Sequence, residues 1–311
     1  MNTEMRGTSE GVRGRQESVR CDVGVSPSTP PFMASKPEAQ VVVKQVPRRA
    51  LELEHEIDDL DLSDFVTVAA KFGQDTFAYV VTPNADHLLR YRDDAAFRAD
   101  YHAAGYILMD SRFVARFLRV TRRVSLRVCT GADLTAALLS RVVTPQDRVL
   151  FIGGSRTQTE RIQERYALHN ICHHNPPMGF IKDPRAVKAC LDFIEANSPF
   201  RFCFLGVGSP QQEAIARMLH DRSVARGLAL CVGASLNFVA GSEKRAPLWM
   251  QHMSLEWLHR LLQDPGRLAH RYLLRGPRIF GHLMRAKVIV RRFPAATQWT
   301  DGTRARVRAS R

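Results

Sequence analysis

Polar residues that could take part in chemistry follow directly after two apolar segments of the sequence. Asp110 comes after the apolar run at 106–109, and a carboxylate in a partly desolvated cleft can act as a general base toward a hydroxyl group. Thr82 and Asn84 come after the run at 77–81 in a Thr-Pro-Asn turn that directs Thr82 toward a cleft. Asp and Asn at such positions also commonly cap the next helix. The sequence leaves the capping and the chemical interpretation open at both turns.

Glycine-containing turns follow two further apolar segments. Gly153 and Gly154 lie between a strand pattern and a helix pattern, where a phosphate can approach backbone N–H groups and the positive end of the helix dipole. Gly208 and Gln212 belong to a Gly-Ser-Pro-Gln-Gln-Glu segment, in which the glutamine can donate and accept toward a sugar or a base. The sequence lacks GxGxxG spacing, GxSxG, HExxH and a P-loop, which argues against NAD binding and against hydrolase and kinase chemistry.

Four residues of metal-ligand type occur close together at His169, Cys172, His173 and His174. Adjacent histidines in a segment that runs into two prolines do not give a coherent ligand spacing, and the sequence has no CxxC pair. We therefore predict no metal ion and no cofactor, and we interpret this segment as a substrate-lining or structural loop.

These residues need a scaffold, and from about residue 60 the chain alternates short apolar segments with helical patterns. Such alternation is typical of an α/β domain with a mostly parallel sheet, in which ligands bind at the carboxyl ends of the strands. The turns at Thr82, Asp110, Gly153 and Gly208 therefore form one candidate site. We predict a Rossmann-like, mostly parallel sheet with flanking helices, with strands at 77–81, 106–109, 148–152, 202–207 and 228–232 and helices at 86–104, 131–140, 157–166, 184–197 and 210–226.

The 311 residues carry a formal net charge of +14, and the excess lies at the end of the chain. Residues 50–243 hold 22 basic and 23 acidic side chains, whereas residues 244–311 hold 15 basic and three acidic ones. A basic excess favours an anionic partner, which can be nucleic acid, an acidic membrane surface or a phosphorylated substrate. We predict three regions: a disordered tail at 1–50, an α/β domain at 51–243 and a basic helical appendage at 244–311 that associates with a membrane.

Within this appendage, the pattern over 254–293 predicts broken helices with apolar residues between Ile279 and Ile289 on one side and arginines around them. Such a segment can lie on an anionic bilayer or pack on the core with a solvated arginine face, and the scarcity of acidic residues favours the bilayer. A nucleic-acid partner is not predicted, because the sequence has no recognised binding motif or aromatic stacking platform. The absence of a long apolar stretch and of a secretory signal, together with scattered cysteines, predicts a chain in the reducing cytosol.

Nine short segments occur in a characteristic order: Thr-Pro-Asn at 82–84, Asp110, Gly-Ala-Asp-Leu at 131–134, Phe-Ile-Gly-Gly at 151–154, Asn-Pro-Pro-Met-Gly-Phe at 175–180, Gly-Ser-Pro-Gln-Gln-Glu at 208–213, the stretch from Gly233 to Gly241, Arg-Ala-Pro at 245–247 and Leu-Glu-Trp-Leu-His-Arg-Leu at 255–261. Any one of them alone is weak. In this order and spacing, they resemble the WecG/TagA/CpsF family, glycosyltransferase family 26, over roughly residues 60–285.

The resemblance implies an inverting, metal-independent bacterial glycosyltransferase. It would move an N-acetylmannosaminyl, hexuronosyl or glucosyl residue from a UDP-sugar to a polyprenyl-diphosphate-linked saccharide in the synthesis of exopolysaccharide or another cell-surface glycan. The enzyme would be peripheral on the cytoplasmic face of the inner membrane. Asp110 matches the family's base, and the substrate-binding positions that match are Thr82, Asn84, Gln212 and, in the basic appendage, Arg260, Arg267 and, as a weaker match, Arg271.

One alternative from a different functional class is a catalytically silent homologue that acts as a scaffold in a membrane-bound polysaccharide assembly complex. The family usually has Asp-Gly where this chain has Asp110 and Ser111. This departure at the base position keeps the alternative open.

Overall fold

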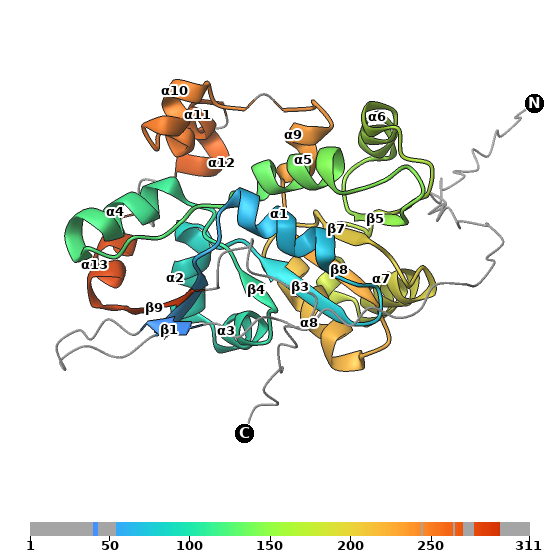
Figure 1. The fold of residues 1–311 in the computed structure, drawn as a ribbon, viewed down its shortest axis with the longest axis horizontal. Helices are drawn as coiled ribbons and strands as arrows, with labels where there is room; N and C mark the ends of the chain where they lie inside the picture. The colour runs from blue at the N-terminus through green and yellow to red at the C-terminus, as the bar shows by residue number, and fades with distance from the viewer. Residues whose placement is uncertain (1–39, 43–53, 244, 264, 270–276, 293–311) are drawn as a thin grey trace, which may run out of the picture.

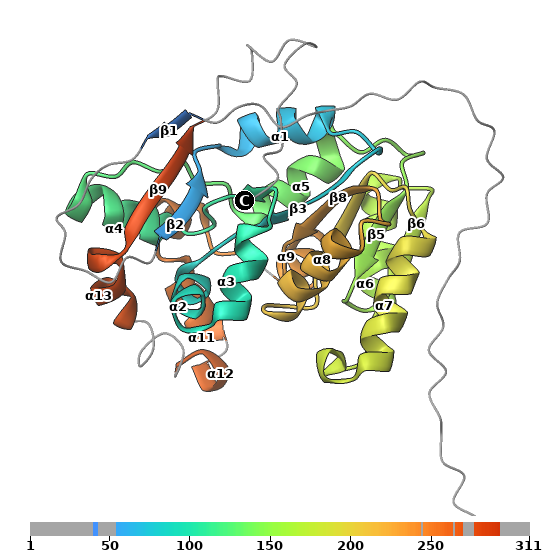
Figure 2. The same cartoon turned by 90° about the horizontal axis from the view of Figure 1, so that it is seen from below.

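The computed structural model describes residues 40–42, 54–243, 245–263, 265–269 and 277–292, and they form two β-sheets with surrounding helices (Figures 1 and 2). No helix within these residues is both long enough and apolar enough to span a bilayer. Of the tail predicted at 1–50, only residues 40–42 are described, and they form a strand.

The larger sheet has six strands, all parallel, in the spatial order β4-β3-β8-β7-β5-β6. Its strands are β3 (Phe77–Val81), β4 (Tyr106–Ile107), β5 (Val149–Ile152), β6 (Ile171–His174), β7 (Phe202–Leu205) and β8 (Gly227–Cys231). The five predicted strands are confirmed to within one or two residues at each end. Every residue of β5, β7 and β8 is buried, which explains why these segments are continuous apolar runs rather than alternating ones.

The sixth strand corrects the prediction of a loop at 169–174. Ile171–His174 is β6, which pairs in parallel with β5 at the edge of the sheet. His173 and His174 are only partly buried there. An edge strand can carry polar residues that a central strand would bury, and for that reason the apolar pattern does not reveal it.

Helices cover both faces of the larger sheet (Figure 1). One face packs against α1 (Leu62–Lys71), α5 (Gly131–Arg141), α6 (Arg156–Tyr166) and α9 (Ser235–Val239), and the other against α2 (Ala85–Asp93), α3 (Ala95–His102), α7 (Pro184–Ala196) and α8 (Gln211–Arg222). The helix predicted over 86–104 is two helices, because the Asp94 side chain accepts hydrogen bonds from the N–H groups of Ala96 and Phe97 and starts a new helix there. Helices α1 and α4 (Arg112–Arg122) were not predicted.

The smaller sheet has three strands in the order β1-β9-β2. Its central strand β9 (Lys287–Arg292) pairs antiparallel with β1 (Gln40–Val42) and parallel with β2 (Glu54–Asp58). The prediction of helix is wrong over β9, where Val288 and Val290 are buried and their neighbours are only partly so. This alternation of period two is typical of a strand, but it spans too few residues to stand out beside the preceding helix.

Helices account for the other described parts of the C-terminal region, as predicted. They are α10 (Leu248–His252), α11 (Glu256–Gln263), α12 (Pro265–Ala269) and α13 (Arg278–Arg285). Helices α4 and α13 lie side by side next to the smaller sheet in both views (Figures 1 and 2), and residues from these helices and from both β2 and β9 form one hydrophobic cluster.

Candidate active site

Asp110 lies at the carboxyl end of the larger sheet, three residues after β4. Its backbone N–H donates to the Pro83 carbonyl at 3.0 Å, and its Oδ1 accepts from the N–H of Gly131, the first residue of α5, at 2.8 Å. The capping interpretation is wrong for the next helix, because Ser111 caps α4 through a hydrogen bond from the Val114 N–H to Ser111 Oγ. Asp110 instead faces the amino end of α5, where the helix dipole favours negative charge.

Thr82 and Gln212 both bind the backbone at the carboxyl end of β8, Thr82 at its last residue and Gln212 two residues later. The buried Thr82 hydroxyl donates to the Cys231 carbonyl at 3.0 Å, and the buried Gln212 Oε1 accepts from the Gly233 N–H at 2.9 Å. A Cβ atom on Gly131 would lie 3.3 Å from Thr82 Oγ1. The structure therefore brings the predicted base loop and these two predicted binding residues together around the end of β8 and the start of α5.

Asn84 is confirmed as a helix cap. Its Oδ1 accepts from the N–H groups of Asp86 and His87 at 3.0 and 3.3 Å, which satisfies two backbone donors at the start of α2. The side-chain oxygen of Asn84 makes both cap hydrogen bonds. The side-chain NH₂ group makes neither of them, so it is the group that could contact a ligand.

Gly153 and Gly154 form a left-handed turn after β5, with φ of +93° and +75°. A Cβ on Gly153 would lie 3.0 Å from backbone atoms of Gly206 and Val207, so glycine is required for the close approach of the turns after β5 and β7. Ser155 then caps α6 in a capping box with Gln158. The packing explains the first glycine without a ligand, and phosphate binding at this turn stays a prediction.

Gly208 also has a positive φ, +84°, but a Cβ there would meet no atom within 4 Å. It opens the turn before α8, whose first residues include Gln212 and Glu213. Gln212 Nε2 donates to Glu213 Oε1 at 2.8 Å, and both side chains are buried. Burial raises the pKa of Glu213 to about 7, although hydrogen bonds such as the one from Gln212 oppose the shift. Glu213 thus holds the amide of a predicted donor-binding residue, a role that the sequence analysis missed although the residue stands in the same motif.

A second group of residues links this edge of the sheet to the C-terminal region. Arg112 Nη2 lies 3.2 Å from Asp133 Oδ2, and its Nη1 lies 3.3 Å from Glu256 Oε1. Arg245 also binds both carboxylates, with Nη2 at 3.1 Å from Asp133 Oδ2 and at 3.6 Å from Glu256 Oε1. The network joins the first turns of α4 and α5 to the first turn of α11, and so it holds α11 beside the loop that carries Asp110.

Asp133 is the centre of this network. Burial alone would raise its pKa, but hydrogen bonds from Arg245 and Thr130 and the charges of Arg245 and Arg112 hold the pKa below its ordinary value. None of the four residues Arg112, Asp133, Arg245 and Glu256 was predicted as a site residue. The last three stand in sequence motifs that carry the family resemblance, so the sequence marked their positions. It could not show that these side chains contact one another, because that depends on the tertiary fold.

The arginines predicted to bind a diphosphate belong to the C-terminal region. Arg260 is in α11 and Arg267 is in α12, whereas Arg271 lies outside the described residues. Substrate contact by all three stays a prediction.

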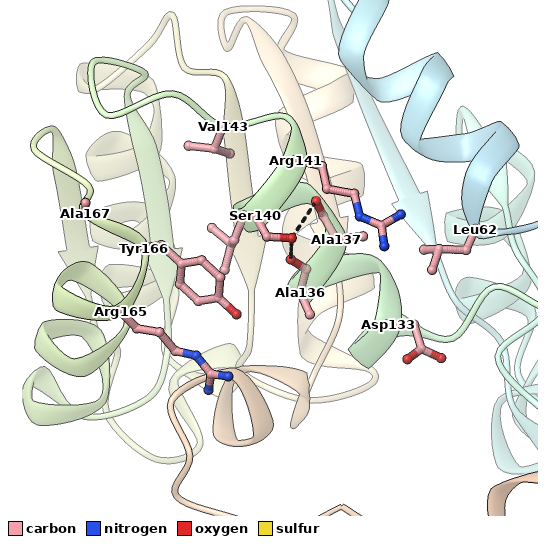
Figure 3. A pocket seen from close by; sticks show the side chains of 11 residues that line it. Leu62, Asp133, Ala136, Ala137, Ser140, Arg141, Val143, Arg165, Tyr166 and Ala167 are labelled. Atoms are coloured by element: carbon pink, nitrogen blue, oxygen red, sulfur yellow. Dashed lines mark hydrogen bonds between the residues drawn. The ribbon is translucent and has the colours of Figure 1, made fainter. Parts of the chain in front are cut away.

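One pocket lies on the outer side of α5, and Asp133 of the ion-pair network is among the residues that line it. It has a volume of about 720 Å³ and runs between α1 and α6 (Figure 3). Its polar groups are partly used within the fold, since Ser140 Oγ donates to the Ala136 carbonyl and Arg165 Nη1 donates to the Val239 carbonyl. None of the predicted site residues lines this pocket, and within the described residues no three His, Cys, Asp or Glu side chains are placed to hold a metal ion.

Comparison with known proteins identifies the family. A model of the Glycosyl transferase WecG/TagA/CpsF family matches residues 51–292. The chain belongs to this family. The match to the WecG/TagA/CpsF family begins before β2 and ends with β9, so it includes two strands of the smaller sheet as well as the α/β body.

A relative from Bacillus spizizenii (strain ATCC 23059 / NRRL B-14472 / W23) is an N-acetylglucosaminyldiphosphoundecaprenol N-acetyl-beta-D-mannosaminyltransferase. It is 28% identical over 218 residues, which cover 67% of this chain and 81% of the relative. Membership of the WecG/TagA/CpsF family and the name of this relative indicate a glycosyltransferase.

Proposed function

We propose that the protein transfers a sugar from a UDP-sugar to a polyprenyl-diphosphate-linked saccharide, with inversion at the anomeric carbon, in bacterial cell-surface glycan synthesis. The observation that carries the proposal is the position of Asp110, whose Oδ1 is held 2.8 Å from the first N–H of α5 beside Thr82 and near Gln212. The name of the Bacillus relative supports a diphosphoundecaprenol-linked acceptor and favours N-acetylmannosaminyl transfer over hexuronosyl or glucosyl transfer.

In this reaction Asp110 removes the proton from the acceptor hydroxyl while its oxygen attacks the anomeric carbon. The bond from that carbon to the donor phosphate breaks on the opposite side, and UDP leaves with additional negative charge. Positive groups must stabilise this charge. The residues that we assign to this task are Arg260, Arg267, Arg271 and the backbone N–H groups at Gly153 and Gly154.

We also propose that the enzyme is peripheral on the cytoplasmic face of the inner membrane. A polyprenyl-linked acceptor resides in a membrane, and residues 244–311 hold 15 basic and three acidic side chains. Such a segment is attracted to anionic headgroups.

The decisive experiment measures transfer from a panel of UDP-sugars to a polyprenyl-diphosphate-linked acceptor for the wild type and for Asp110→Asn. Loss of a general base lowers turnover by roughly 10²–10⁴-fold, while UDP binding measured by calorimetry stays within about threefold of the wild-type value because the substitution keeps the size of the side chain. Asp94→Asn is the matched control, since Asp94 is an exposed cap of α3 and asparagine is an equally good cap.

Undiminished turnover in Asp110→Asn would remove Asp110 from the base role. A wild-type protein that binds none of the UDP-sugars and transfers none of them would instead support the scaffold alternative.

A further inference from the structure

Two arginines of the ion-pair network share one loosely bound carboxylate. Glu256 Oε1 lies 3.3 Å from Arg112 Nη1 and 3.6 Å from Arg245 Nη2, and only the shorter contact is a hydrogen bond. The other oxygen of this carboxylate makes no ion pair within the described residues. Glu256 is the first residue of α11, so its side chain can rotate without disturbing the helix.

The second carboxylate of the network is bound more firmly. Asp133 Oδ2 lies 3.2 Å from Arg112 Nη2 and 3.1 Å from Arg245 Nη2. It also accepts from the Thr130 hydroxyl at 2.7 Å, while Asp133 Oδ1 accepts from Arg245 Nη1. Asp133 thus neutralises one of the two cations, and Glu256 neutralises the other. If Glu256 turns away, one unit of positive charge remains on the two guanidinium groups.

The two arginines stand beside the proposed base. Arg112 follows Asp110 by two residues, and Asp133 follows by two residues Gly131, whose N–H binds Asp110 Oδ1 at 2.8 Å. A hydrogen bond to Asp133 raises the pKa of Arg245, and the charge of Asp110 is among the further causes. The side chains of Arg112 and Arg245 are 31% and 28% exposed, so a ligand that approaches Asp110 can reach them.

We infer that Arg112 and Arg245 bind the diphosphate group of a substrate, which displaces the Glu256 carboxylate from between them; the inference rests on the proposed function. The planar fork of an arginine matches both a carboxylate and a phosphate. An internal carboxylate that touches two arginines therefore marks a position that phosphate oxygens can take. Both proposed substrates carry a diphosphate, and that of the donor is bonded directly to the anomeric carbon.

This exchange differs from a purely structural role in the sign of its effect. A structural ion pair orders both partners, so removal of Glu256 would loosen the two arginines and weaken any ligand that they bind. A carboxylate that competes with the ligand instead lowers the affinity for it. Removal of the Glu256 charge is then expected to strengthen binding of a diphosphate.

The test measures by calorimetry how the full chain binds UDP, geranyl diphosphate and uridine. UDP represents the diphosphate of the donor, geranyl diphosphate represents that of the lipid-linked acceptor, and uridine has no phosphate. The variants are Glu256→Gln, Arg112→Gln and Arg112→Lys. The matched controls are Asp221→Asn and Arg217→Gln, which break an ion pair of 2.8 Å in the last turns of α8. All variants are checked for unchanged thermal unfolding.

We expect Glu256→Gln to bind at least one of the two diphosphates about threefold more tightly, because a partly exposed competing ion pair changes an equilibrium by a small factor. Arg112→Gln is expected to bind the same ligand about tenfold more weakly, since it loses a charge-assisted hydrogen bond, and Arg112→Lys is expected to fall between it and the wild type. Uridine binding and both controls stay at the wild-type values. A change for UDP assigns the donor diphosphate, and a change for geranyl diphosphate assigns that of the acceptor.

Unchanged or weaker binding of both diphosphates by Glu256→Gln would overturn the inference and leave a structural ion pair. Equal changes for UDP and uridine would also overturn it, because they would not involve the phosphates, and so would a wild type that binds neither diphosphate. Sugar transfer by the wild type in any of these cases leaves the proposed function standing. The expected shifts in a protein that transfers no sugar would instead keep the diphosphate site and refute the proposed function.

Discussion

The larger and the smaller sheet of this protein are held together by different kinds of contact. The strands of the larger sheet come from one continuous stretch of chain, and three of them are buried at every residue. The smaller sheet joins β2 and β9, which are far apart in the sequence and contain charged residues at several positions. Its central contact is electrostatic, since Arg291 binds the buried Asp58 through Nε at 2.5 Å and Nη2 at 2.9 Å.

Asp58 also connects the two sheets. Its Oδ2 accepts from the N–H of Ile107 in β4 at 2.8 Å while the same carboxylate pairs with Arg291 in β9. Burial dominates in the larger sheet, whereas the smaller one combines a few buried apolar residues, Ile57, Val288 and Val290, with directed interactions of Asp58. Three substitutions test this contrast.

The largest effect is expected at Gly227 in the larger sheet. Its φ is +123°, and a Cβ there would lie 2.1 Å from the Phe200 carbonyl oxygen. Gly227→Ala is expected to lower the free energy of unfolding by about 5 kcal/mol, because backbone strain and overpacking act together. Gly241→Ala is the matched control, with φ of +70° and no atom within 4 Å of the added Cβ, and it should cost about 1 kcal/mol. Equal losses in urea denaturation would refute a packing limit at Gly227.

The second substitution tests the electrostatic contact of the smaller sheet. Asp58→Asn keeps an acceptor for the Ile107 N–H but removes the charge opposite Arg291, so unfolding free energy should fall by about 3 kcal/mol. Glu56→Gln is the control, because Glu56 contacts the same arginine at 3.3 Å but its side chain is 34% exposed, and an exposed pair contributes less than about 1 kcal/mol. Similar losses in both variants would show that burial of the pair does not decide its strength.

The smallest effect is expected at the buried carboxyl group of Glu213, which has a hydrogen bond from Gln212 but no ion pair within the described part of the chain. The unfolded chain releases the Glu213 proton near the ordinary pKa of 4.5, whereas the folded protein keeps it up to about pH 7. The folded state therefore binds more protons between these values, and stability falls as pH rises through them. Glu213→Gln does not titrate, so its stability relative to the wild type should increase by about 2 kcal/mol between pH 5 and pH 8. A constant difference in urea denaturation at the two pH values would contradict the raised pKa.

The same contrast explains how far the sequence could predict the fold. Continuous apolar runs such as 202–205 and 228–231 predict strands because they are buried on both faces. The helices are predicted in the longer stretches of chain that separate one strand from the next. Strand β9 could not be predicted, because its apolar residues resemble the end of an amphipathic helix and its partners lie near the other end of the chain. Polar edge strands such as β6 lack the signal altogether.

For the site, the order of motifs predicted which residues gather at the edge of the sheet, and the structure brings Asp110, Thr82 and Gln212 together. The order of motifs could not predict which local hydrogen bonds each residue makes. Asn84 caps α2 while Asp110 faces α5, although both follow strands in the same way. The network of Arg112, Asp133, Arg245 and Glu256 required the positions of three helices, which no local pattern contains.

The position of β9 between β1 and β2 sets an order of assembly during synthesis. The last strand of the larger sheet ends at Cys231, so that sheet can be completed while later residues are still inside the ribosome. The smaller sheet must wait for Arg292, because its central strand is the last of the three to be made. Helix α13 immediately precedes that strand, and it reaches α4 only at this late stage. The nascent α/β body is thus complete before α13 can pack on α4 and before the smaller sheet can form.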